Sequence, residues 1–204
     1  GTWTTCTAET AGAFSAVAYF FGRDLQEHTN VPIGLVTAYL GGTKIQSWTP
    51  LCAYEQTPEL APQLDWIQMK QKVYRRDKAL YVPEAAAWLP KAQAALAAGR
   101  EVPDPPQSPD PIDPFARNPQ DPTALFNGMI QPLMPYAIRG AVWYQGESDV
   151  GDNTVSYYVR LKALIDNWRG LWGQGTFPFF IVQIAPYERY GPGAGCARSQ
   201  ARLR

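Results

Sequence analysis

Two short turns in this chain carry residues that could stabilise a negative charge during a reaction. The first, Gly41-Gly42-Thr43, and the second, Gln145-Gly146-Glu147, each follow an apolar run. Glycine adopts positive φ without strain and leaves backbone N–H groups open to a ligand, and such groups can stabilise an oxyanion. The Gln145 side chain is a neutral amide that could donate in the same way, and Glu147 could order the site or bind a hydroxyl. The candidates for one site are therefore Gly41, Gly42, Gln145 and Glu147.

Both turns also have a purely structural interpretation. Gly41 and Gly42 would then form a plain tight turn. Ser148, Asp149 and Asp152 would start a helix by accepting hydrogen bonds from its first N–H groups. For Asp149 and Asp152 we expect this structural role and no other.

The elements that must position these turns are predicted to form a parallel sheet. Three apolar runs, separated by helix-like stretches, are typical of strands buried on both faces of such a sheet. They are Val31–Leu40, Ala137–Tyr144 and Phe177–Ile184. The turns that follow parallel strands gather at one edge, where open α/β folds hold their active sites. The sequence therefore predicts an α/β fold with a site at that edge.

Helical periodicity predicts the elements between the strands. The expected helices are Thr10–Thr29, Pro58–Leu80, Glu84–Ala98 and one after Asp152, whose buried stripe would be Tyr157, Leu161, Leu164, Ile165 and Trp168. The prolines of Glu101–Pro122 predict a surface loop. We expect a single domain over residues 1–204, with a helical insertion packed beside the sheet at about 55–100 and a Pro-rich loop at about 101–122.

Two aromatic residues are candidates for stacking on a sugar ring. Trp48 follows the first predicted strand and Tyr187 follows the third, so both would lie on loops at the predicted site edge. Trp143 lies inside a predicted strand, and a core position is favoured for it.

The composition argues against several classes of function. The chain has 204 residues with 18 basic and 18 acidic side chains, so it has no electrostatic footprint for nucleic acid or for an acidic membrane surface. No apolar run reaches the roughly 18 residues of a transmembrane helix. Cys6, Cys52 and Cys196 lack the spacing of a zinc site. There is no phosphate loop or dinucleotide fingerprint, and we expect no metal or organic cofactor.

A Ser-His-Asp relay cannot be assembled from residues of this chain. His28 is the only histidine, and it lies at the end of the first predicted helix, where it would interact with the helix dipole. No serine lies in a Gly-x-Ser-x-Gly motif. Ser47 and Ser148 remain as alternative nucleophiles, but without a histidine base.

Several motifs are spread over the region from Phe14 to Tyr187. They are Phe14–Leu25, Val31–Val36, Leu40–Thr43, Ala124–Leu133, Ile138–Ser148, Trp168–Gly173 and Phe177–Tyr187. Together they resemble the sialate O-acetylesterase-like branch of the SGNH hydrolases. The resemblance implies a flavodoxin-like three-layer α/β/α sandwich with a mainly parallel sheet. It also implies hydrolysis of acetyl esters on sugars by a serine nucleophile, with an acetylated sugar or another small acetyl ester as the substrate.

In that family the serine lies in a Gly-Gln-Ser-Asn motif, and the catalytic Asp and His lie in an Asp-x-x-His motif; neither motif occurs in this chain. The resemblance maps Gly41 and Gly42 onto the second conserved block of the family. It maps Gln145, Gly146 and Glu147 onto the third. Such positions complete the family's oxyanion hole.

The same resemblance sets expectations for the ends and the location of the protein. It implies a secreted or periplasmic enzyme, although the chain opens Gly-Thr-Trp without a signal peptide. We expect residues 1–204 to be the central portion of an esterase, truncated at both ends. The alternative is a catalytically inactive carbohydrate-binding or interaction domain derived from the esterase fold, which the missing motifs favour for the isolated chain.

Overall fold

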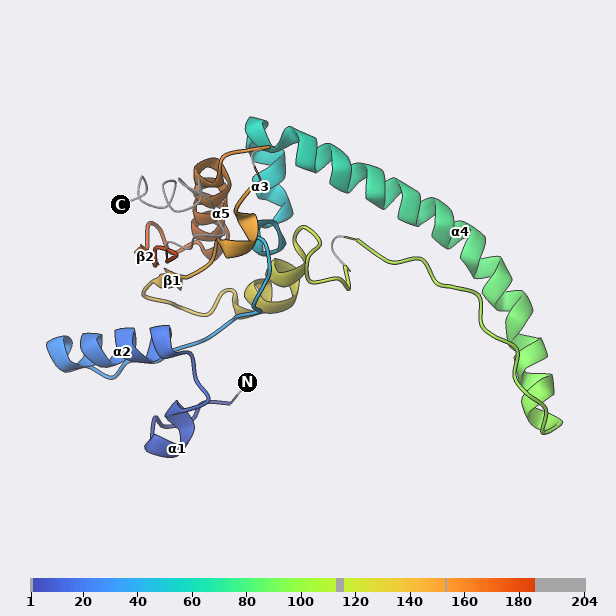
Figure 1. The fold of residues 1–204 in the computed structure, drawn as a ribbon, viewed down its shortest axis with the longest axis horizontal. Coiled ribbons are helices and arrows are strands. Elements are labelled where there is room, and N and C mark those ends of the chain that lie inside the picture. Colours follow the sequence, from blue (N-terminus) through green and yellow to red (C-terminus); the bar gives the residue numbers. More distant parts are fainter. Residues whose placement is uncertain (1, 113–115, 153, 186–204) are drawn as a thin grey trace. The chain divides into compact units, whose positions relative to one another are not determined.

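The structure is a computed structural model that describes residues 2–112, 116–152 and 154–185. It forms two compact units, Gly1–Gly41 and Gly42–Arg204. Figure 1 shows their helices and strands along the chain. No helix in the described residues combines the length and the apolar character needed to cross a membrane.

The first unit holds two helices where the sequence predicts one. α1 spans Ala8–Ala11 and α2 spans Ala16–Thr29. The break has a local cause, because Ser15 caps α2 by accepting a hydrogen bond from the Ala18 N–H. α2 ends at Asn30, whose φ of 53° lies in the left-handed region.

The predicted strand Val31–Leu40 is wrong, because residues 31–40 form no strand in the structure. An apolar run becomes a strand only when neighbouring strands satisfy its N–H and C=O groups, and the sheet of the described residues pairs β1 with β2 and does not include this run. Several of its apolar side chains are exposed, with Tyr39 at 66% and Val36 at 50%. Apolar composition alone therefore did not determine its conformation.

The second unit contains a short parallel sheet that confirms two of the predicted strands. β1 spans Ala141–Trp143 and β2 spans Phe179–Ile181, with Ala141 opposite Phe179 and Trp143 opposite Ile181. α5, Tyr157–Trp172, connects them. This is the β–helix–β order that the sequence predicts. The strands are shorter than the apolar runs, which extend for several residues beyond the paired segment.

α5 also has the predicted buried stripe. Tyr157, Leu161, Leu164, Ile165 and Trp168 are all buried. The helix begins after Ser156, which accepts a hydrogen bond from the Val159 N–H, and it ends at Gly173 with a left-handed φ of 65°. Neither Asp152 nor Asp149 is its N-cap.

The predicted helices Pro58–Leu80 and Glu84–Ala98 are one continuous helix, α4, over Ala61–Ala97. Pro83 and Pro90 lie inside it. A proline removes one backbone donor, but alanines follow both prolines in the sequence and favour the helix. A break at residues 81–83 was therefore the wrong prediction.

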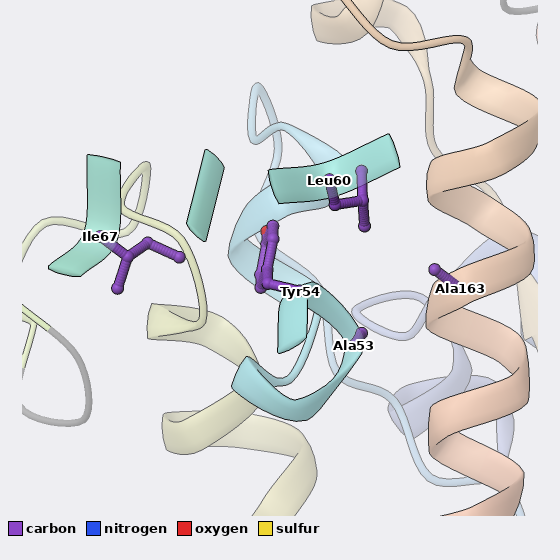
Figure 2. Close-up of a cluster of buried hydrophobic side chains, with 5 residues drawn as sticks. All are labelled: Ala53, Tyr54, Leu60, Ile67 and Ala163. Carbon is purple, nitrogen blue, oxygen red and sulfur yellow. The ribbon is translucent and has the colours of Figure 1, made fainter. Parts of the chain in front are cut away.

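Short helical segments precede α4. They are η1 over Ile45–Trp48, α3 over Leu51–Gln56 and η2 over Pro58–Leu60. A buried cluster joins α3 and the start of α4 to α5, and Figure 2 shows its members, Ala53, Tyr54, Leu60, Ile67 and Ala163. Further along α4, Leu80, Leu89 and Leu96 are exposed. This part of α4 therefore presents apolar side chains to solvent, while Ala92 and Ala95 are buried.

The Pro-rich segment contains no helix or strand in its described part up to residue 117. It folds back along α4, where the Trp88 indole N–H donates to the Pro103 carbonyl at 2.8 Å. A π-helix, η3 over Phe126–Ile130, and a 3₁₀ turn, η4 over Gln131–Leu133, then lead to β1. One further 3₁₀ turn, η5 over Glu147–Asp149, follows β1.

Candidate functional site

The turn that follows β1 lies directly against the turn that begins the second unit. The Gln145 amide Nε2 donates to the Thr43 carbonyl at 3.0 Å and to Asp149 Oδ2 at 2.6 Å. Its Oε1 accepts a hydrogen bond from the Tyr157 hydroxyl at 2.8 Å. Residues 43 and 145, which are 102 positions apart, are therefore held together by a single side chain.

Gly42 has the backbone freedom that the sequence suggests. Its φ is 74°, and an added Cβ would meet no atom within 4 Å, so the space beside it is open. Its carbonyl accepts a hydrogen bond from Gln120 Nε2 at 2.8 Å, while none of the described residues accepts from its N–H. Because Gly42 is an exposed residue, we consider its N–H a candidate donor to a ligand. Gly41 is also exposed, as the last residue of the first unit.

The sequence-based role of Gln145 needs a correction. It was expected to donate its amide directly to an oxyanion. In the structure the nitrogen donates to two acceptors within the protein, Thr43 and Asp149, and a primary amide has only two N–H bonds. The side chain therefore holds the turn that carries Gly42, and no unused N–H is left on it.

Asp149 is more than the helix-start residue that we expected. It is only 2% exposed. Its Oδ2 accepts from the Ile45 N–H at 2.9 Å and from Gln145, and its Oδ1 accepts from Arg160 Nη1 at 2.9 Å. Burial raises the pKa of the Asp149 carboxyl, while the hydrogen bonds from Gln145 and Ile45 and the charge of Arg160 act in the opposite direction.

Arg160 and Asp152 complete this polar cluster. Arg160 lies on the buried face of α5 and also donates to Asp152 Oδ2 at 3.2 Å. Asp152 is more exposed than Asp149, with 22% of its side chain accessible against 0%. It accepts from both the N–H and the hydroxyl of Thr154, so its role is to shape the loop before α5.

Sequence reasoning missed Arg160 and Tyr157 as partners of the candidate site. A signal was present, because Arg160 lies three residues after Tyr157 and four before Leu164, on the apolar stripe of the predicted helix. Charged residues in such a stripe are rarely buried without a partner. The nearest acidic candidates upstream were Asp149 and Asp152.

The remaining candidates lie in different surroundings. Glu147 is exposed and begins η5, two residues after Gln145. Ser47 is fully buried, which argues against a nucleophile, and Ser148 is half-buried. His28 belongs to the first unit. Tyr187 lies outside the described residues.

Trp48 belongs to the core. It is 4% exposed, its indole N–H donates to the Thr43 hydroxyl at 3.0 Å, and its ring packs edge-on against Trp143 at 6.2 Å between centroids. Its carbonyl accepts from the Trp168 indole N–H at 3.1 Å. Because these contacts bury the ring, we no longer expect it to stack on a sugar.

Trp48→Ala is expected to destabilise the second unit. Truncation of a buried tryptophan typically lowers the free energy of unfolding by about 3–5 kcal/mol. We would measure this by urea denaturation of the extended protein, meaning residues 1–204 expressed with the coding sequence that flanks them. Trp66→Ala, at a site that is 38% exposed on α4, is the matched control. An unchanged unfolding free energy for Trp48→Ala would contradict the core assignment.

The described residues bring together no group of three or more His, Cys, Asp or Glu side chains that could hold a metal ion. The site is instead built from amide, hydroxyl and carboxylate groups with one guanidinium. Its open feature is the N–H of Gly42. In such an arrangement the Gly42 N–H can donate to a developing negative charge. Gln145, which is bonded to Thr43 and Asp149, keeps the turn in position.

Comparison with known proteins shows which family and which proteins this chain is similar to. Residues 111–201 match the family described as carbohydrate esterase, sialic acid-specific acetylesterase. Sialate O-acetylesterase of Homo sapiens is 29% identical over 195 residues, which cover 90% of this chain and 28% of that protein. The Rattus norvegicus sialate O-acetylesterase is 31% identical over 185 residues, with 85% and 30% covered.

A solved structure shows the same relationship in three dimensions. A carbohydrate acetylesterase from Xanthomonas citri has 27% sequence identity and a TM-score of 0.63, and the match covers 98% of this chain and 34% of that one. The chain thus spans about a third or less of the length of the relatives it matches. The family match includes the Gln145 turn, and Gly42 lies before it.

Proposed function

Because the chain belongs to the sialate O-acetylesterase-like carbohydrate esterases, we propose that it serves the hydrolysis of acetyl esters on sugars. The observation that carries this proposal is the hydrogen bond from Gln145 to Thr43. It joins the turn Gln145-Gly146-Glu147 to the turn Gly41-Gly42-Thr43, where the space beside Gly42 is open. The relatives support the esterase over the alternative of an inactive binding domain.

In the proposed mechanism a serine attacks the acetyl carbonyl, and water then releases acetate from the acyl-enzyme. The serine, histidine and aspartate of that relay are not among these 204 residues. The Gly42 N–H donates to the oxyanion of the tetrahedral intermediate. Gln145 fixes the position of that donor through Thr43. A donor placed in advance stabilises charge without reorganisation during the reaction.

We also propose a role for the exposed residues around the turn. Glu147 follows Gln145 closely and is exposed, so it can accept a hydrogen bond from a sugar hydroxyl. Tyr187 remains our candidate for stacking on the ring, and Gly41 is the second glycine that allows the turn to approach the substrate. No cofactor is required for this chemistry.

The fold and location that we propose follow the family. The parallel pair β1 and β2, joined by α5, and the likeness to the Xanthomonas citri esterase support the three-layer α/β/α sandwich of the SGNH hydrolases. A secreted or periplasmic location is proposed on the same basis.

The test is acetate release by the extended protein. O-acetylated sialic acid and an aryl acetate would be incubated with purified protein of verified mass, and free acetate would be measured by an enzyme-coupled assay. We expect turnover of both substrates, with a higher kcat/KM for the sugar. If the folded extended protein bound acetylated sugar without releasing acetate, the alternative of an inactive carbohydrate-binding domain would replace this proposal.

His28→Ala is expected to leave acetate release within about threefold of the unsubstituted protein, since removal of a general base typically costs about 10²-fold or more. His28 is exposed in the last turn of α2, and its Nδ1 contacts the Asp24 carbonyl at 2.8 Å. This hydrogen bond, followed by the charge of Asp24, raises the pKa of His28.

The same substitution should have a pH-dependent effect on the stability of α2. A raised pKa means that the stabilisation by His28 is present in acid and is lost as the pH rises through that pKa. Thermal unfolding at acid and neutral pH would check this.

For the activity of His28→Ala, a hundredfold loss of kcat for acetate release in a folded protein would contradict the first prediction and make His28 catalytic.

A further inference from the structure

The Gln145 amide is held by a buried ion pair that the proposed mechanism does not yet use. Asp149 Oδ2 accepts from Gln145, and Asp149 Oδ1 accepts from Arg160. The side chain of Arg160 is 7% exposed and that of Asp149 is 0% exposed. The pair is therefore shielded from solvent. It is connected to the turn that carries Gly42 through the Gln145 side chain.

Asp149 joins three segments that are distant in the sequence. It receives the N–H of Ile45 at the start of η1, the amide of Gln145 after β1 and the guanidinium of Arg160 on α5. Thr43, which accepts the other amide hydrogen of Gln145, is two residues before Ile45. Asp149 thus contacts Ile45 directly and is connected to Thr43 through Gln145.

The helix that supplies Arg160 is itself firmly held. Ala163, one turn further along α5, packs in the buried cluster with Ala53 and Leu60 (Figure 2). The Tyr157 hydroxyl, one turn before Arg160, donates to Gln145 Oε1 and accepts from the Trp143 indole N–H at 3.1 Å. Helix α5 therefore holds Gln145 directly through Tyr157 and indirectly through Arg160, which contacts Asp149.

We propose that the Asp149–Arg160 pair is the positioning element for the oxyanion turn. It sets the Gln145 amide and the Ile45 N–H, and through them the Gly42 N–H. This inference rests on the proposed function. Asp149 is a positioning residue and not a catalytic one, because a carboxylate that is 2% exposed cannot reach the substrate.

Stability alone is a poor explanation for this pair. Taking two charges out of water costs free energy, and replacement of a buried ion pair by apolar residues is often neutral or stabilising. A pair with this geometry is better explained by the fixed positions that it gives to the Gln145 amide and the Ile45 N–H. A displacement of about 1 Å at a reacting centre can cost roughly 10²-fold in rate.

The test begins with Asp149→Asn in the extended protein. An Asn keeps the shape of the side chain, but its NH₂ group must then face either Arg160 or the donors Gln145 and Ile45. We expect kcat for acetate release to fall by about 10²-fold, with KM changed by less than about threefold, because the change affects the transition state more than substrate binding.

Asp152→Asn is the matched control, since it removes a contact with the same arginine without touching Gln145. Because that contact is partly exposed, it should change kcat by less than about threefold. Equal losses in the two variants would overturn the proposal.

A double-mutant cycle with Gln145→Met separates positioning from general destabilisation. Because Asp149 acts partly through Gln145 and partly through Ile45, the loss in the double variant should be smaller than the product of the two single losses. Losses that multiply in full would overturn the proposal. Hydrogen exchange supplies a readout besides activity: the Ile45 amide should lose protection in Asp149→Asn and keep it in Asp152→Asn.

Two further outcomes distinguish a failure of the proposed esterase function from a failure of the positioning role of the Asp149–Arg160 pair. If the unsubstituted extended protein releases no acetate, the proposed function fails; the inference then fails as well only if the Ile45 amide exchanges equally in both Asn variants. If Asp149→Asn does not fold, Arg160→Lys tests the same contact. Lysine keeps the charge but has one donor nitrogen in place of the planar guanidinium fork. An unchanged kcat in that variant would overturn the inference.

Discussion

Residues 1–204 alone are expected to hydrolyse an aryl acetate with a kcat about 10⁶-fold below that of the extended protein. This is the scale of loss when the serine or histidine of a hydrolase relay is removed. The chain contains neither the Gly-Gln-Ser-Asn nor the Asp-x-x-His motif. Oxyanion donors and substrate binding alone leave about 10³–10⁴-fold catalysis over water. Initial rates of both proteins, matched in concentration, would measure the difference.

The control for this comparison is the extended protein in which the serine of the Gly-Gln-Ser-Asn motif that we expect there is replaced by alanine. It should be as slow as residues 1–204, because both lack the nucleophile. Robust turnover by the pure 204-residue chain would mean that another residue, such as Ser148, supplies the nucleophile. The assignment of the missing relay would then be wrong.

Gln145→Met in the extended protein is expected to lower kcat by about 10²–10³-fold, the range found for loss of one oxyanion donor. Methionine is close to glutamine in length and cannot donate to Thr43 or Asp149. The Gly42 turn then loses the side chain that holds it. Because the oxyanion forms only in the transition state, KM should change much less than kcat.

Two comparisons make the Gln145 result specific. Gln131→Met, at an exposed position on η4, should leave both constants unchanged. Glu147→Ala should raise KM more than it lowers kcat if Glu147 contacts a sugar hydroxyl. If Gln145→Met changed only KM, Gln145 would be a substrate contact, and our account of the turn would be wrong.

Several parts of the fold could be predicted from the sequence. The apolar stripe of α5 identified the residues that are buried, and glycine, at Gly170 or Gly173, indicated where the helix ends; the structure has Gly173 as the cap. The apolar runs around Val142 and Phe180 identified the two paired strands. These features are local in the sequence, since helix periodicity, strand composition and glycine caps each act over a few residues.

Other parts depended on neighbours that periodicity cannot reveal. Residues 31–40 had the apolar content of a strand but form none in the structure. The sequence predicted two helices with a break at residues 81–83, but α4 continues through this stretch. Trp48 looked like a loop residue available to a sugar, and the packing of Trp143 and Trp168 placed it in the core.

The candidate site shows the same division. The sequence by itself determined the types of residue at the two turns, their place after apolar runs, and the resemblance to the carbohydrate esterases. Only the tertiary structure decided that Asp149 accepts three hydrogen bonds and that Gln145 donates to Thr43 and Asp149. The physical reason is that a buried carboxylate is stable only where donors from distant segments converge on it, and that convergence exists only once β1, η1 and α5 have packed together.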